Sequence, residues 1–306
     1  MKVLVFGGAG FLGSYVVDEL ITRMHDVTIY DLKTSLYTNV NATIIVGDIM
    51  DVEAVKAAIK GHDAVYNFAG LADLNDSIDK PVETVTLNVI GNLNILEAAR
   101  LAGVKRYLYA SSVYVFSQKG AFYGASKKSS ELIVEQYGEQ YDIDYTIVRY
   151  GSVYGERANS NNRIYRILRE ALTEHKITFK GNGLEEREYV HGRDAGKLSV
   201  DVLEDNKYCN QNVILTGIER FRYSDLLGFV KEMLNNEVSV EMLDQDYEGH
   251  YTLTPYSFSP SIGVKLVNNP SVDFGQGLLQ CINHVFNELQ EEGLVDAMPV
   301  PPEYSE

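Results

Sequence analysis

The chain begins with MKVLVFGGAGFLG (residues 1–13), in which an apolar run leads into four glycines within seven residues. We expect a strand at residues 2–6 and a helix at residues 12–23, with the glycines in the turn between them. A turn by itself needs only one or two glycines. This spacing therefore indicates a place where the backbone must approach another group closely.

Gly7, Gly10 and Gly13 have the positions that a dinucleotide-binding turn requires. One glycine permits unusual backbone angles, a second lets the backbone approach a pyrophosphate, and a third lets helix and strand pack closely. Asp31 ends the second expected strand, where its carboxylate can bind both ribose hydroxyls and repel a 2′-phosphate. The pattern predicts NAD rather than NADP. The alternative is a glycine-rich turn that only begins a helix.

Composition limits the possible partners and locations of the protein. The 306 residues carry a net charge of −16, which argues against a nucleic acid or an anionic membrane as partner. Cys209 and Cys281 are the only cysteines, so we expect no disulfide framework and a cytoplasmic location. We also expect no signal peptide and no membrane span. The histidines are scattered without metal-ligand spacing, so we expect no metal.

Short β-rich runs alternate with helical patterns through the first half of the chain. Such alternation predicts βαβ units and a parallel sheet. The alternation ends after residue 155, although residues 212–215 resemble a later strand of the same sheet. The expected strands are residues 2–6, 26–30, 42–46, 64–67, 106–110 and 146–149, and the expected helices are residues 12–23, 51–59, 82–102 and 127–141.

We therefore predict an α/β protein with a doubly wound parallel sheet and a smaller, partly discontinuous C-terminal domain. Residues 1–155 and 187–216 should form the cofactor-binding domain. Residues 156–186 and 217–297 should form the substrate domain. Residues 298–306, which contain prolines, should be a flexible tail.

Tyr123-Gly124-Ala125-Ser126-Lys127 places a phenol and an ammonium group at i and i+4 of an expected helix, on one face. A neighbouring cation favours the phenolate, so we expect a lowered pKa for Tyr123. Ser112 follows an expected strand and can bond the same substrate oxygen. This is an acid–base arrangement for moving a proton during hydride transfer. The alternative is a tyrosine and a lysine on the surface of a helix.

The GxxGxxG turn and the YxxxK motif together resemble the extended short-chain dehydrogenase/reductase family. The resemblance implies a Rossmann fold with bound NAD, and catalysis by Ser112, Tyr123 and Lys127. Asp48 would contact the adenine, although it could instead cap the next helix. The resemblance implies cofactor contacts from Gly7, Gly10, Phe11, Leu12, Gly13, Asp31, Asp48, Ile49, Ala69, Asn88, Tyr123 and Lys127.

Later stretches are similar to the substrate-binding motifs of sugar-nucleotide enzymes in this family. Ser152 lies in RYGSVYG (residues 149–155), where the family has an asparagine near the sugar diphosphate. Arg187 begins a stretch that resembles the one whose arginine binds the diphosphate, and its guanidinium suits paired oxygens. The alternative is that Arg187 pairs with a surface carboxylate. Phe179 lies where the family cradles the nucleotide base.

The residues after Ser112 separate the chemistries of the family. Dehydratases carry an Asp-Glu pair there, decarboxylases a glutamate at the second position, and GDP-fucose synthases a cysteine, whereas this chain has Val113 and Tyr114. The remaining chemistry is hydride transfer at one carbon, with Tyr114 as a substrate contact. We predict an NAD-dependent nucleotide-sugar epimerase, acting at C4 through a transient 4-keto intermediate on a UDP-sugar. A net NAD(H)-linked reductase or dehydrogenase and a non-catalytic NAD-binding scaffold are the alternatives.

The resemblance also implies a homodimer, because helices at 82–102 and 127–141 pair between subunits in similar proteins. Their apolar positions include Leu93, Leu96, Leu132 and Ile133. A role of these side chains in the core is nearly as good an interpretation.

Overall fold

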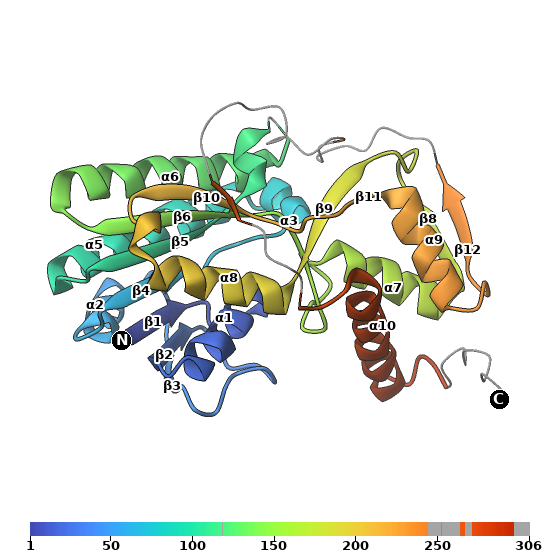
Figure 1. Cartoon of the computed structure of the whole chain (residues 1–306), viewed down its shortest axis with the longest axis horizontal. Helices are drawn as coiled ribbons and strands as arrows, with labels where there is room; N and C mark the ends of the chain where they lie inside the picture. The colour runs from blue at the N-terminus through green and yellow to red at the C-terminus, as the bar shows by residue number, and fades with distance from the viewer. Residues whose placement is uncertain (118, 244–251, 253–263, 267–270, 297–306) are drawn as a thin grey trace.

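A twisted parallel sheet forms the centre of the computed structural model, which describes residues 1–117, 119–243, 252, 264–266 and 271–296. The predicted tail, 298–306, lies outside the described residues. Within them the sheet has eight strands in the order β13-β10-β6-β5-β4-β1-β2-β3 (Figure 1). These strands are β1 (Lys2–Phe6), β2 (Asp26–Asp31), β3 (Thr43–Val46), β4 (Ala64–Asn67), β5 (Arg106–Ser112), β6 (Asp144–Tyr150), β10 (Gln211–Leu215) and β13 (Val264–Leu266).

All neighbouring strands of this sheet run parallel. The strand order reverses beside β1, which pairs with both β2 and β4. This is the doubly wound arrangement, in which ligands bind outside the carboxyl ends of the strands where the order reverses. The predicted α/β class and Rossmann fold are therefore confirmed.

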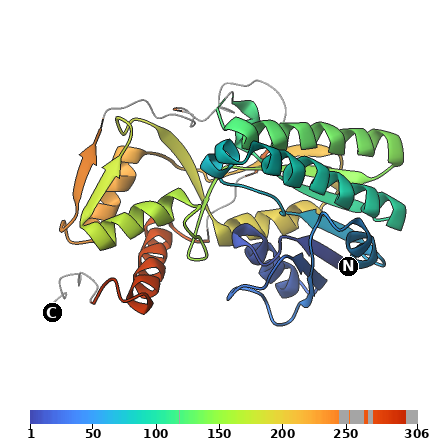
Figure 2. The same cartoon turned by 180° about the vertical axis from the view of Figure 1, so that it is seen from behind.

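Helices cover both faces of the sheet, as Figures 1 and 2 show. The helices α1 (Phe11–Thr22) and α8 (Gly192–Glu204) share one hydrophobic core with the strands. On the opposite face lie α2 (Val52–Ile59), α5 (Asn92–Ala102) and α6 (Ala121–Tyr141). Because both faces are covered, the central strands are apolar on both sides. Among the described helices, none has the length and apolar character needed to cross a bilayer.

Two helices differ from their predicted bounds by more than one residue. The segment predicted at 82–102 is divided into α4 (Pro81–Val85), a π-helical turn (Thr86–Gly91) and α5. The helix predicted at 127–141 begins earlier, because Gly120 adopts a left-handed conformation (φ +102°) that starts α6 at Ala121. Tyr123 and Lys127 therefore both lie on α6.

The remaining elements surround a second hydrophobic core, and they lie beyond the carboxyl edge of the central sheet (Figure 1). A two-stranded parallel sheet pairs β8 with β12, and a three-stranded sheet has the order β11-β9-β7. These elements are β7 (Ser152–Tyr154), α7 (Arg163–Glu174), β8 (Lys176–Phe179), β9 (Glu186–His191), β11 (Arg220–Arg222), α9 (Tyr223–Met233), β12 (Ser239–Met242) and α10 (Phe274–Glu291). The short helix α3 (Leu74–Asp79) instead follows β4 and packs against α4 and α6.

The glycine turn is packed too closely to hold side chains. Gly7 has a left-handed backbone (φ +75°), and a Cβ atom there would lie 2.8 Å from the backbone nitrogen of Ala69. A Cβ atom on Gly13 would lie 2.2 Å from the carbonyl oxygen of Gly7. The turn, the loop after β4 and the start of α1 are therefore in direct backbone contact.

We expect Gly13→Ala to lower the free energy of unfolding by about 2 kcal/mol, the usual cost of overpacking. Gly228→Ala is the control, because Gly228 lies inside α9 with no atom within 4 Å of its added Cβ. That control should be stabilised by up to about 1 kcal/mol, since alanine favours helix. Urea denaturation measures both values. Equal stability of Gly13→Ala and wild type would contradict the close packing of the turn.

Candidate active site

A cleft of about 630 Å³ runs along the carboxyl edge of the sheet. Gly7, Gly10 and Gly13 line it together with Phe11 and Leu12. Gly10 is the N-cap of α1 and has no side chain to satisfy the first helical N–H groups. These N–H groups and the positive end of the helix suit a pyrophosphate. The size of the cleft and the crowding of the glycines fit a dinucleotide.

Asp31 ends β2 beside this turn. Its Oδ2 accepts a hydrogen bond from the backbone N–H of Ala9 (3.0 Å), and its Oδ1 accepts one from Leu32 (2.8 Å). Burial raises the pKa of Asp31, whereas the backbone N–H groups oppose that rise. The carboxylate is thus tied to the glycine turn, at the place where the sequence predicts contact with the ribose.

Asp48 does not cap the following helix. Its Oδ1 accepts a hydrogen bond from the N–H of Met50 (2.9 Å), whereas Asp51 is the N-cap of α2. Ile49 is buried next to Gly91, where an added Cβ would lie 2.5 Å from Ile49 Cδ1. The alternative of a capping role for Asp48 is therefore wrong.

Asn88 fixes the loop after β4. Its side chain lies in the π-helical turn, accepts a hydrogen bond from the N–H of Leu71 (2.7 Å) and donates to Leu71 O and Ser126 Oγ (2.9 Å each). The N–H of Ala69 in the same loop donates to Asn67 Oδ1 (3.0 Å). The neighbouring loop residues Phe68 and Gly70 line the cleft. Asn88 thus links this loop to α6.

Ser112, Tyr123 and Lys127 line the same cleft from β5 and α6. Lys127 is buried, and its Nζ donates to the carbonyl oxygen of Ala110 (2.8 Å). The Nζ atom lies 5.9 Å from the ring centroid of Tyr123 and 4.9 Å from that of Tyr109. The structure thus brings the three residues together at the carboxyl end of β5.

Burial dominates the titration of both acid–base groups. It lowers the pKa of Lys127 to about 8, and the nearby Glu131 carboxylate opposes this change. Burial raises the pKa of Tyr123, and a hydrogen bond with Ser112 opposes that rise. The expected lowering of the Tyr123 pKa is therefore wrong for the protein by itself, because desolvation of the phenolate outweighs its neighbours.

A second cavity, of about 220 Å³, shares Ser112 and Tyr123 with the cofactor cleft. Tyr114 and Ser152, which the sequence predicts as substrate contacts, both line it. The ring of Tyr114 lies edge-on to Tyr123, with 6.3 Å between centroids. The two cavities therefore meet at Ser112 and Tyr123.

Phe179 and Arg187 are not among the residues that line either cavity. Phe179 is fully buried against Tyr223, with 4.6 Å between ring centroids. The Arg187 guanidinium is also buried, 5.5 Å from the Tyr223 ring. It is Tyr223, at the start of α9, that lines the cavity instead.

The second cavity is called the substrate-side cavity from here on, because the predicted substrate contacts Tyr114 and Ser152 line it. Sequence reasoning missed two arginines that line this cavity, Arg163 and Arg166 of α7. Their only sequence signal is a repeated positive charge, since Arg163, Arg166 and Arg169 follow one another every third residue. Asp73, in the loop after β4, lines both cavities and was also missed.

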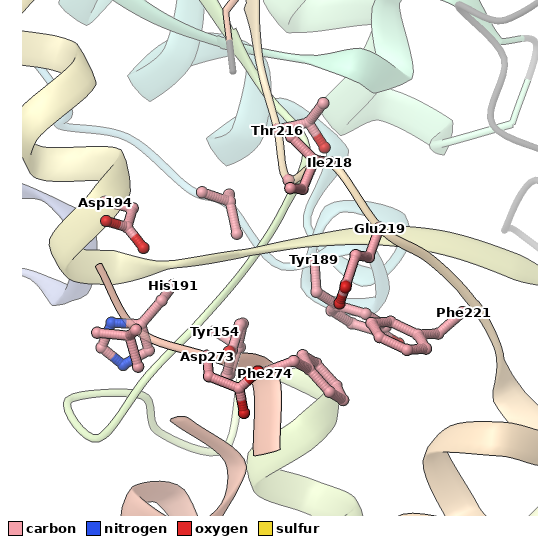
Figure 3. Close-up of a pocket in the computed structure, with 13 residues that line it drawn as sticks. Tyr154, Tyr189, His191, Asp194, Thr216, Ile218, Glu219, Phe221, Asp273 and Phe274 are labelled. Atoms are coloured by element: carbon pink, nitrogen blue, oxygen red, sulfur yellow. The ribbon is translucent and has the colours of Figure 1, made fainter. Parts of the chain in front are cut away.

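A smaller cavity of about 60 Å³ lies where β9, α8 and the start of α10 meet (Figure 3). The rings of Tyr154 and Tyr189 pack against Phe274, with centroids 5.2 and 5.4 Å away. The Asp194 carboxylate accepts hydrogen bonds from the N–H and hydroxyl of Ser271. This cavity is too small for a nucleotide. In the described part of the chain, no group of three or more His, Cys, Asp or Glu side chains could hold a metal.

Comparison with known proteins identifies the family of this chain. Residues 3–214 match the NAD dependent epimerase/dehydratase family, and the chain belongs to that family. A UDP-N-acetyl-alpha-D-glucosaminuronate decarboxylase of Bacillus cytotoxicus is 30% identical over 71% of this chain and 75% of its own. A UDP-glucose 4-epimerase of Corynebacterium glutamicum is 27% identical over 79% of this chain and 83% of its own.

Among solved structures, the UDP-glucose 4-epimerase of Thermus thermophilus in complex with NAD has the same fold. It superposes with a TM-score of 0.79 at 23% identity and covers 94% of this chain and 99% of its own. Family membership makes NAD the cofactor of this protein and identifies an enzyme of the nucleotide-sugar epimerase and dehydratase type. Gly7, Gly10, Gly13 and Asp31 are the residues that would hold the NAD.

Because the pKa of Lys127 falls from 10.5 to about 8 on folding, the unfolded chain binds the proton more tightly. Stability should therefore rise with pH between about 8 and 10.5, and this gain should be absent in Lys127→Met. We expect the unfolding free energy of wild type, minus that of the variant, to increase across this interval and to stay constant below it. Urea denaturation at several pH values measures the difference. A constant difference throughout would show that Lys127 titrates normally in the folded protein.

Proposed function

We propose that this protein is an NAD-dependent epimerase that inverts C4 of a nucleotide-activated sugar, with a UDP-sugar as the favoured substrate. The observation that carries the proposal is the meeting of the two cavities at Ser112 and Tyr123. A sugar carbon held there would face both the cofactor cleft and the acid–base pair. The likeness to the UDP-glucose 4-epimerase of Corynebacterium glutamicum supports the same reaction class.

In the proposed reaction, Tyr123 takes the proton of the C4 hydroxyl while Ser112 bonds to the same oxygen. Protonated Lys127, fixed by Ala110, favours the phenolate by its charge. Bound NAD supplies the acceptor, and later the donor, of the C4 hydride. The 4-keto sugar turns in the cavity, and Tyr123 returns the proton after the hydride has reached the other face.

Elimination of water or carbon dioxide is less well supported. Val113 is buried in the protein interior, and Tyr114 occupies the next position. Neither side chain is a carboxylic acid or a thiol that could serve as the additional acid or base. This argument holds despite the likeness to a decarboxylase. A net NAD(H)-linked reductase or dehydrogenase would use the same groups as an epimerase, and it stays the alternative within the family.

A non-catalytic scaffold is the alternative from another class. Burying the Lys127 ammonium group costs free energy, as its lowered pKa shows. A protein that only bound NAD would have no need of a buried lysine beside a half-buried tyrosine and a buried serine. Groups with pKa values shifted in this way gather at catalytic sites.

Tyr123→Phe should lose activity on the order of a hundredfold or more, because it removes the proton-carrying oxygen and little volume. Its affinity for NAD should be retained. Tyr141→Phe, at the exposed end of α6, is the matched control and should remain fully active. Steady-state rates with a UDP-sugar and titration with NAD measure the two properties. If the variant kept activity within a few-fold of wild type, another group would have to carry the proton, and Tyr114 would be the first candidate.

A substrate deuterated at C4 separates epimerase from dehydrogenase. We expect the deuterium to remain at C4 through inversion, because the hydride returns from the same bound cofactor. Mass spectrometry and NMR of the product measure the label, and absorbance measures free NADH. Loss of the label with accumulation of NADH would identify a dehydrogenase. A product that lacks water or carbon dioxide would refute the argument from Val113 and Tyr114.

We also propose a homodimer through α4, the π-helical turn and α6, which pack together. Val82, on α4, is 79% exposed, and Leu132, on α6, is 58% exposed. Phe122, also on α6, is exposed as well. Leu96, in contrast, belongs to the core below. Apolar side chains exposed on adjoining elements favour contact with another copy of the chain.

Leu132→Glu should convert this dimer to a monomer, because it places a charge in an apolar contact. Leu36→Glu is the control, since Leu36 is 97% exposed in the loop between β2 and β3. Light scattering at micromolar concentration gives the molar mass of each variant. A monomeric wild type would contradict the proposal.

A further inference from the structure

The substrate-side cavity receives its positive charge from one helix end. Arg163 and Arg166 lie in the first turn of α7, which Asn162 caps by accepting a hydrogen bond from the N–H of Ile164 (3.0 Å). Among the residues that line the two larger cavities, the cations are Lys127, Arg163 and Arg166. Lys127 lies in the cofactor cleft, so α7 provides the cations on the substrate side.

Arg163 has an unsatisfied donor. Its Nε atom is buried, and no described residue accepts a hydrogen bond from it. Its guanidinium carbon lies 5.5 Å from the ring centroid of Phe179. A buried donor without an acceptor costs free energy, which an anionic ligand would recover.

Arg166, three residues further along α7, is held by two contacts of its own. Its Nη1 donates to the carbonyl oxygen of Ser160 (3.0 Å) and lies 3.4 Å from Oδ2 of Asp73. Asp73 is itself fixed as the N-cap of α3, because it accepts hydrogen bonds from the N–H groups of Asn75 and Asp76. The ion pair therefore connects α7 to the loop after β4, across the substrate side of the site.

Other parts of the chain offer few cations for this cavity. Arg187 is buried beside Tyr223 and does not line it. The sequence contains no arginine after Arg222, and its only lysines there are Lys231 and Lys265. In a chain with a net charge of −16, two arginines in one cavity are a local exception.

We propose that Arg163 and Arg166 bind the diphosphate of the nucleotide-sugar substrate, with Asp73 as a positioning residue that holds Arg166 at the cavity. This inference rests on the proposed function, because it assumes a substrate with a diphosphate. Two guanidinium groups match the charge and the paired oxygens of that group. Their place on α7 leaves Ser112 and Tyr123 free to face the sugar in the same cavity.

Isothermal titration of the NAD-loaded, full-length protein with UDP and with uridine tests this inference. Arg163→Gln and Arg166→Gln should each weaken UDP binding on the order of tenfold or more, because each loses a charged contact to phosphate. Uridine, which has no phosphate, should bind each variant as it binds wild type. Arg163→Lys keeps the charge but not the paired donors, so its affinity for UDP should lie between those of wild type and Arg163→Gln.

Arg169→Gln is the matched control. It removes the same charge from α7, but Arg169 pairs with Glu292 (2.6 Å) and does not line either cavity. UDP should bind this variant as tightly as wild type. NAD affinity, measured for every variant, shows that each protein is folded.

The outcomes separate this inference from the proposed function. UDP binding that is unchanged in Arg163→Gln and Arg166→Gln overturns the inference and leaves the epimerase proposal standing. An equal loss of UDP affinity in Arg169→Gln also overturns it, because the effect would then come from the general charge of α7. An equal loss of uridine affinity overturns it as well, because the arginines would then act on the base or the ribose. A wild-type protein that does not bind UDP overturns the UDP-sugar assignment and this inference together.

Discussion

The backbone crowding at the glycine turn is the constraint on which the remaining structure depends. A Cβ atom at Gly7 or Gly13 would lie within 3 Å of backbone atoms, so only glycine lets α1 start directly against β1 and the loop after β4. This approach brings the N-terminus of α1 to the carboxyl edge of the sheet. It also fixes Asp31, whose carboxylate bonds to the N–H of Ala9 within the same turn. The cofactor cleft thus depends on the absence of side chains at Gly7 and Gly13.

A buried ionic network performs a similar task on the catalytic side. The Glu131 carboxylate accepts hydrogen bonds from Ser111 Oγ (2.5 Å) and from Arg149 Nε (2.9 Å). These contacts connect α6 to β5 and β6. Glu131 lies one helical turn after Lys127 on α6, and Ser111 directly precedes Ser112 on β5. Burying such charges is costly unless they are paired, so the network holds α6 in a single position. The separation of Tyr123 and Ser112 depends on that position.

The cofactor side and the substrate side are built by different rules. At the glycine turn, the cofactor cleft is lined by backbone that no side chain covers, and the Asp31 carboxylate is bonded to that turn. The substrate-side cavity uses long side chains from α7, α9 and the 3₁₀ turn at Val113–Phe116, including Arg163, Arg166 and Tyr114. Side chains of this kind can differ between proteins without a change in the sheet, so one fold can hold different binding sites.

The sequence by itself determined the features that depend on neighbours along the chain. Glycine spacing predicted the cofactor turn, alternating periods predicted the parallel sheet, and the i, i+4 spacing of Tyr123 and Lys127 placed both on one helix face. Only the tertiary structure decided which side chains line the cavity. Phe179 and Arg187 are buried because Tyr223, distant in sequence, packs against both, whereas Arg163 lines the cavity. Burial of a side chain depends on contacts between distant segments, which no local pattern contains.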